Sequence, residues 1–112
     1  MEDQENFAEL IRIAGRTIDN AEYAVAVADA KEKKITAQTM VMAEARGDKT
    51  HAKQQRSADE DDAVFEARLA RGKAKGALAA AKSDLIAAEC EFKVWQSTMA
   101  NLRFEKNRVY NT

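Results

Sequence analysis

The sequence predicts an all-α protein, a long antiparallel helical hairpin that resembles a coiled coil, and three observations lead to this fold class. The 112 residues include 23 alanines, four glycines and no proline, and 33% of them are charged. This composition favours long helices. The regular turn signals that an all-β fold needs about every dozen residues are missing. Apolar residues also recur at alternating spacings of three and four, which is the heptad pattern of coiled coils.

The first predicted helix covers about residues 4–45. Its apolar residues form two seams with coiled-coil spacing. The pattern weakens where Glu32 and Thr39 fall on the first seam, and we expect residues 31–34 to form either a kink or a solvated helical turn. The first seam contains Ile11, Ile18 and Val25, and the second contains Phe7, Ala14, Ala21, Ala28, Ile35 and Met42.

The clearest break in the helical pattern lies at residues 46–50. Gly47 suits the left-handed position after a helix, and Thr50 suits the N-cap of the next helix. A second start signal is the capping-box pattern Ser57-Ala58-Asp59-Glu60. We predict that the second helix begins at residue 51 and not at 57, because no helix breaker lies between the two signals.

The second predicted helix covers about residues 51–109. One of its seams is mostly large and the other is small over three heptads, which lets two helix axes approach closely. Gly72, Gly76 and Ala80 add a stripe of small residues that indicates close packing or a bend. The large seam contains Val64, Arg71, Leu78, Leu85, Phe92 and Met99, and its partner contains Ala67, Ala74, Ala81, Ala88, Trp95, Leu102 and Val109.

The two predicted helices differ in length, about 65 Å against about 90 Å at 1.5 Å per residue. We therefore expect a single helical domain, residues 1–112, in which the C-terminal end extends beyond the first helix. This end carries the largest apolar side chains, Phe104 among them, and a lone hairpin leaves such side chains in water. The sequence thus predicts a homo-oligomer with an interface formed by Phe92, Trp95, Met99 and Leu102.

Composition and motifs argue against an enzyme and a membrane protein. No apolar run approaches the roughly 18 residues of a membrane span, and the acidic start Met1–Glu5 does not resemble a signal peptide. One cysteine, Cys90, and one histidine, His51, provide no disulfide, metal cluster or catalytic triad. The acidic run Asp59–Asp62 suits a helix start and fits no calcium loop. We predict a cytoplasmic protein without catalytic residues, cofactor or metal.

Basic residues of the second helix are the candidate contacts to nucleic acid. No acidic residue lies between Glu66 and Asp84, and a second basic cluster is mixed with Phe104 and Tyr110. Such a mixture suits single-stranded DNA, in which phosphates pair with cations and bases stack on aromatic rings. A solvated helix surface is the competing interpretation, and the net charge of −1 argues against strong nonspecific binding. The candidate residues are Arg68, Arg71, Lys73, Lys75, Lys82, Arg103, Lys106 and Arg108.

Residues 37–104 resemble the UvsY-type recombination mediators, small helical proteins that phages encode beside their recombination genes. The shared pattern is a helix, the turn Arg46-Gly47-Asp48 and a second helix. That helix carries Ala79-Ala80-Ala81-Lys82-Ser83-Asp84-Leu85 and then Glu91-Phe92-Lys93-Val94-Trp95. The resemblance implies a ring-like oligomer that binds single-stranded DNA and helps to load a recombinase in place of the single-strand binding protein.

One departure from that family concerns the DNA contacts. The mediators hold DNA with basic residues on the helix before the turn, whereas Ala37–Ala45 contains no lysine or arginine. No DNA-contacting residue is therefore carried over from the family. Two other functions remain open: an adaptor or inhibitor that binds host or phage proteins through its helix faces, and a structural coiled-coil assembly component.

Overall fold

The computed structural model describes the backbone of residues 2–110 and the side chains of residues 5–108. Over this range the chain is all-α, as predicted. It forms α1 (Glu2–Ala45), α2 (His51–Glu60) and α3 (Asp62–Tyr110). The helices divide into two compact units, unit 1 (Met1–Ile18 with Ala80–Thr112) and unit 2 (Asp19–Ala79).

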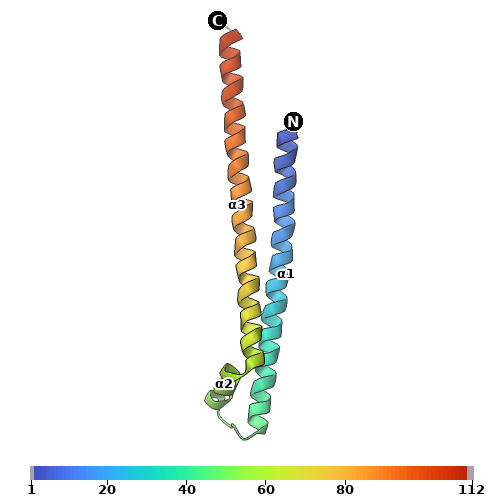
Figure 1. Cartoon of the computed structure of the whole chain (residues 1–112), viewed down its shortest axis with the longest axis vertical. Helices are drawn as coiled ribbons and strands as arrows, with labels where there is room; N and C mark the ends of the chain where they lie inside the picture. The colour runs from blue at the N-terminus through green and yellow to red at the C-terminus, as the bar shows by residue number, and fades with distance from the viewer. Residues whose placement is uncertain (1, 111–112) are drawn as a thin grey trace. The chain divides into compact units, whose positions relative to one another are not determined.

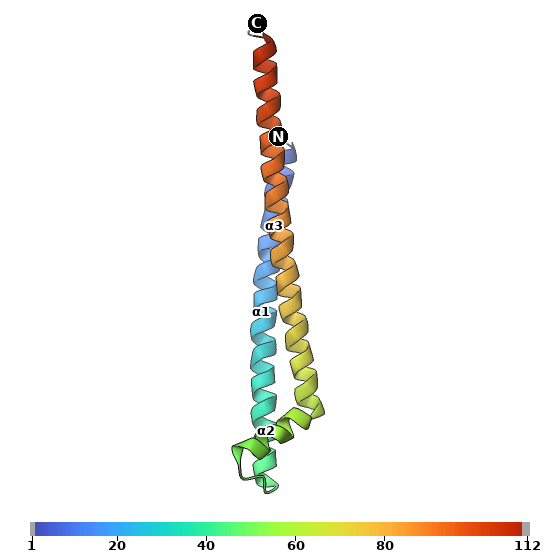
Figure 2. The same cartoon turned by 90° about the vertical axis from the view of Figure 1, so that its left-hand side faces the viewer.

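Each unit contains an antiparallel pair formed by a part of α1 and a part of α3. In unit 2, Glu32 of α1 forms ion pairs with Arg68 and Arg71 of α3. In unit 1, the ring of Phe7 lies 5.6 Å from the ring of Phe92, measured between centroids. Figures 1 and 2 both show the paired segments running side by side in opposite directions. The predicted antiparallel hairpin is therefore confirmed.

The described part of the second predicted helix begins at residue 51 but does not continue unbroken. The hydroxyl of Thr50 accepts a hydrogen bond from the backbone N–H of Lys53 at 3.2 Å, which caps α2. Asp61 then leaves the helical conformation, with ψ at 129°. Its carboxylate accepts a hydrogen bond from the N–H of Val64 at 3.0 Å and caps α3. The prediction of one helix from 51 to 109 is thus wrong at Asp61.

The end of unit 2 where α1 finishes is closed by the turn and by α2, which lies at an angle to α3 (Figures 1 and 2). Gly47 adopts a φ of 110°, the left-handed conformation expected after a helix. The hydroxyl of Ser57 donates to the carboxylate of Asp48 at 3.0 Å. Ser57 therefore ties α2 to the turn and does not cap a helix.

The predicted seams hold over most of the two helices. α1 remains helical through residues 31–34, where the three lysines are exposed, while Glu32 and Thr39 occupy partly buried positions on the seam. Near the end of α1 the register differs from the prediction: Met42 is 62% exposed and Ala43 is fully buried. Val109 lies outside the residues with described side chains.

The glycine stripe does not mark close packing. α3 is helical through Gly72 and Gly76. A Cβ atom built at either position meets no atom within 4 Å. The prediction that another helix packs closely against these glycines is therefore wrong within the chain, and both lie on an open helix surface.

The hydrophobic core is thin. Among the described side chains the fully or nearly fully buried residues are Ala43, Ala58, Val64 and Ala81, and Val64 is the largest of them. Many large apolar side chains are instead exposed, including Tyr23 at 73% and Val94 at 66%. Within the described helices no segment is both long and apolar enough to cross a membrane.

Candidate interaction surfaces

Two of the basic residues predicted to contact nucleic acid are engaged in ion pairs in unit 2. Arg71 lies on the large seam of α3, and its Nη1 donates to Oε2 of Glu32 at 3.4 Å. Its Nε also forms an ion pair with Asp29. Arg68 contacts Glu32 at 3.5 Å and donates to Asp59 at 2.9 Å. Both guanidinium groups therefore neutralise carboxylates of the same chain.

This network explains why a charged pair interrupts two apolar seams. Glu32 retains only 15% side-chain exposure, and an unpaired carboxylate at that depth would be strongly destabilising. Arg71 faces it from the opposite seam. The Nε–Oδ1 contact to Asp29 has the distance but not the direction of a hydrogen bond. Charge attraction accounts for that part of the network.

The same network acts on Asp59 beside the α2–α3 junction. The hydrogen bond from Arg68 holds the pKa of the Asp59 carboxyl below its ordinary value, and a hydrogen bond from Gln55 acts in the same direction. Of the acidic run, Asp61 caps α3, Asp62 lies in its first turn and Asp59 pairs with Arg68. Throughout the described residues, no group of three or more His, Cys, Asp or Glu side chains is placed to hold a metal ion.

The other predicted contacts to nucleic acid are exposed and are distributed over both units. Unit 2 contributes the two lysines closest to the glycines of α3, and unit 1 contributes the remaining four residues. Phe104, adjacent to Arg103 and one turn from other basic side chains, is 68% exposed. Tyr110 lies outside the residues with described side chains. The exposed set is Lys73, Lys75, Lys82, Arg103, Lys106 and Arg108.

Three aromatic side chains form a cluster in unit 1. The ring of Phe7 lies 5.6 Å from that of Phe92 and 5.8 Å from that of Trp95, and the latter two are stacked 6.0 Å apart. These separations are typical of favourable aromatic pairs. The indole Nε1 of Trp95 is buried and has no hydrogen-bond partner among the described residues. The cluster therefore packs α1 against α3 within a single chain.

This cluster corrects the predicted position of the C-terminal extension. Phe92 and Trp95 were expected to extend beyond the first helix, but Phe7 lies against both of them. The break at Asp61 causes the difference, because the turn and α2 use residues that were expected to lengthen the pair. Fifteen residues of α3 follow Trp95 and five residues of α1 precede Phe7, so about ten residues extend past α1, roughly 15 Å (Figure 1).

Met99 and Leu102, the other two predicted interface residues, lie in this end of α3. Met99 is partly buried, whereas Leu102 is 53% exposed. Both residues continue the α3 seam beyond Trp95, towards the end of α3 that extends past α1. We refer to residues 99–108 as the C-terminal segment.

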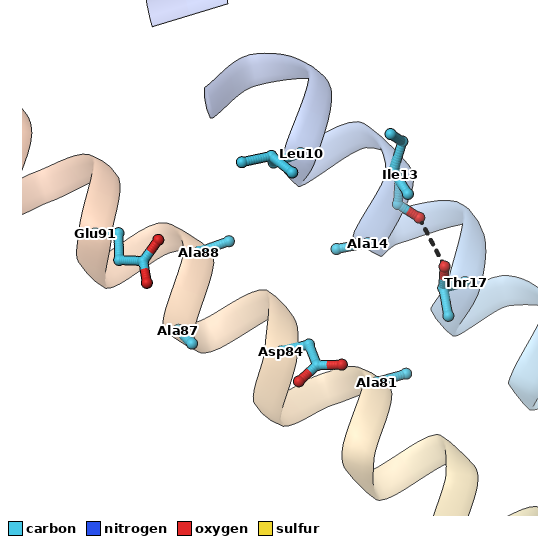
Figure 3. Close-up of a pocket in the computed structure, with 9 residues that line it drawn as sticks. All are labelled: Leu10, Ile13, Ala14, Thr17, Ala81, Asp84, Ala87, Ala88 and Glu91. Atoms are coloured by element: carbon cyan, nitrogen blue, oxygen red, sulfur yellow. Dashed lines mark hydrogen bonds between the residues drawn. The ribbon is translucent and has the colours of Figure 1, made fainter. Parts of the chain in front are cut away.

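A groove with acidic residues along one wall lies between the two helices of unit 1, and we call it the unit 1 groove. It has a volume of about 320 Å³. Leu10 and Ile13 project from α1, while Asp84 and Glu91 stand on α3 seven residues apart, about two helical turns (Figure 3). Alanines and Thr17 complete the lining, at Ala14, Ala81, Ala87 and Ala88.

Unit 2 contains a larger and more apolar groove, with a volume of about 650 Å³, which we call the unit 2 groove. Its walls carry Tyr23, Val27 and Ile35 from α1, and its charged residues are Lys31 and Glu66. Alanines from both helices supply the rest of the lining, at Ala24, Ala28, Ala63, Ala67, Ala70 and Ala74. Small side chains on the seam therefore leave a channel along this side of the pair.

The alanines at 14, 28, 67, 74, 81 and 88 and Ile35, which line these grooves, were predicted as seam residues, whereas the larger apolar residues beside them were not. Leu10, Ile13 and Tyr23 lie outside the a/d seams, and they were therefore not assigned to a surface. The signal was present, because apolar residues beside an alanine seam widen the apolar face of an amphipathic helix. No protein-family model, curated protein or solved structure matches this chain.

Proposed function

We propose that the protein is a non-enzymatic interaction module that binds other helices through the outer faces of its hairpin. The observation that carries this proposal is the amount of exposed apolar surface. Large apolar side chains are exposed in both units, among them Leu10 at 50% and Val94 at 66% in unit 1, and Tyr23 at 73% and Phe65 at 56% in unit 2. So many exposed large apolar side chains are typical of proteins that bury them against a partner.

The two grooves indicate how a partner helix is held. An amphipathic helix binds in a groove by placing side chains at spacings of three and four into an apolar channel. The unit 2 groove offers such a channel, with Tyr23 on its wall. The charged residues Lys31 and Glu66 provide the polar edge that fixes the partner's register.

Photo-crosslinking in the cells that naturally produce the protein tests this function. A photoreactive phenylalanine analogue replaces Tyr23, and a matched control carries it at Lys75, an exposed position of α3 in the same unit. We expect covalent protein–protein products from position 23 and few from position 75. A folded, expressed variant that yields no product from position 23 would contradict the proposed function.

Single-stranded DNA binding is a second candidate, and the exposure of Phe104 favours it. The ring is 68% exposed, with Arg103 beside it and Lys106 two residues further on, so that stacking and phosphate contacts are available in one segment. On this proposal the protein acts as a recombination accessory, the role that the resemblance to mediators implies. The ion-paired Arg68 and Arg71 are not needed for it.

Polarisation of a labelled single-stranded oligonucleotide, titrated at several salt concentrations, tests the second candidate. We expect an affinity that falls steeply with salt, that is weakened by Phe104→Ala, and that is weakened further by replacing Lys73, Lys75 and Lys82 together with glutamate. Absence of binding at low salt would exclude this function and leave the protein-binding module. Using lysines outside the Glu32 network avoids a variant that loses binding because it unfolds.

A further inference from the structure

We propose that the unit 1 groove binds the C-terminal segment of a second copy of this chain, and that each copy does so for the other. This inference rests on the proposed function and names the partner for one of its surfaces. Two observations carry it: the groove and the segment have opposite charges, and both have apolar surfaces without a partner in one chain.

The C-terminal segment combines apolar and basic side chains on one side of α3. Lys106 follows Met99 by seven residues and Leu102 by four, and such spacings place side chains on the same side of a helix. Arg103 lies next to Leu102. Leu102 is 53% exposed, and neither Arg103 nor Lys106 has an ion-pair partner among the described residues. The segment is thus an amphipathic helix end with a basic edge.

The unit 1 groove has the complementary character. Leu10 and Ile13 supply its apolar wall and are each about half exposed. Asp84 and Glu91 lie along α3 at the other wall, and within the described part of the chain neither carboxylate forms an ion pair (Figure 3). The segment, with Arg103, Lys106 and Arg108 against Glu105, has a net charge of 3 − 1 = +2, opposite in sign to the groove, and Arg103 and Lys106 are the two positive charges that match Asp84 and Glu91. Charge complementarity of this kind selects the partner and its register.

One symmetry operation satisfies both contacts. Because each chain carries the groove and the segment, a two-fold axis places the segment of each copy in the groove of the other and closes the assembly as a dimer. The apolar residues Leu10, Ile13 and Leu102, each about half exposed in one chain, would be covered in such a dimer.

Complementary charge-reversal variants test the inference. The first variant is Arg103→Glu with Lys106→Glu, which leaves both the groove and the segment acidic. The second is Asp84→Lys with Glu91→Lys, which leaves both basic. We expect the wild type to sediment as a dimer and each variant alone to have a dimer dissociation constant about tenfold to hundredfold higher. An equimolar mixture of the two variants should form a heterodimer, because both of its contacts again join opposite charges.

Lys73→Glu with Lys75→Glu, in unit 2, is the control for a change in overall charge and should dimerise as the wild type does. Circular dichroism of every variant reports whether the helices remain folded. A monomeric wild type, or two variants that dimerise normally, would overturn the inference. Neither result affects the photo-crosslinking test of the proposed function, which reads the other unit.

Discussion

Arg71 and Glu32 lie on opposite seams of the hairpin, with Nη1 and Oε2 3.4 Å apart. The two side chains neutralise each other's charge at positions where the rest of each seam is mostly apolar. Each residue alone breaks the heptad pattern of its helix. Together they favour the observed register of the two helices in unit 2, because a shift by one heptad would place Glu32 opposite Val64 or Leu78.

Replacing Arg71 with methionine should lower the free energy of unfolding by roughly 1–2 kcal/mol, because Asp29 loses its partner and Glu32 keeps only Arg68, while the side-chain volume is retained. Urea unfolding followed by circular dichroism measures the change. The control is Arg12→Met, whose partner Glu9 is 49% exposed, and we expect less than about 0.5 kcal/mol there. Equal effects in the two variants would remove the special role of the seam pair.

Phe7→Ala should destabilise unit 1 by roughly 2 kcal/mol, because the ring packs against both Phe92 and Trp95 and is partly buried. Trp95 is the only tryptophan of the chain, so its fluorescence reports directly on the cluster. We expect a red shift of its emission in the folded variant. Phe104→Ala, at an exposed position, should leave both stability and emission unchanged.

The Asp59 carboxyl should titrate at a lower pH than an ordinary aspartate. Its pKa is lowered in the folded state, so its stabilising contribution is present above the unfolded pKa of about 3.9 and is lost as the pH falls through the folded value. Arg68→Met should raise the pKa of Asp59 towards the ordinary value, since the main cause of the shift is removed. A carbon-detected NMR titration measures it, and Arg68→Lys should restore part of the shift.

Alanine substitutions at three glycines should change the free energy of unfolding in different directions. Gly47→Ala should lower the free energy of unfolding by about 1 kcal/mol, because a φ of 110° is unfavourable for a side chain. Gly72→Ala and Gly76→Ala should each raise it by about 0.5–1 kcal/mol, because both lie within α3 and an added methyl meets open space. Thermal unfolding of the three variants, compared with the wild type, distinguishes the two directions.

The heptad pattern predicted most of the fold because it is a local and repeated signal. The start of α2 at residue 51 and the left-handed Gly47 were predicted from single residues with strong preferences. The start of α3 at Asp62 was harder to predict. Ser57 and Asp61 both suit an N-cap, and the choice between them depends on Asp48, which binds Ser57 from across the turn.

The candidate site was less predictable, because charge alone does not show whether a basic side chain pairs with a carboxylate of its own chain or remains exposed for a partner. Arg68 and Arg71 have the same local sequence character as Lys73 and Lys75, yet only the arginines have carboxylates of α1 within reach. The grooves depend on which apolar residues lie beside the alanine seam of the opposite helix. Such pairings join residues distant in the sequence and follow from the register of the hairpin.

The separation in sequence between contacting residues increases from the turn towards the open end of the hairpin. The bond between Ser57 and Asp48 joins residues nine positions apart, the bond between Arg71 and Glu32 spans 39, and the Phe7–Phe92 contact spans 92 − 7 = 85. The entropy lost in closing a loop increases with its length, and contacts close in sequence form faster. Pairing that starts at the turn shortens each later closure, so we expect the contacts to form in order from the turn outwards, with the aromatic cluster last.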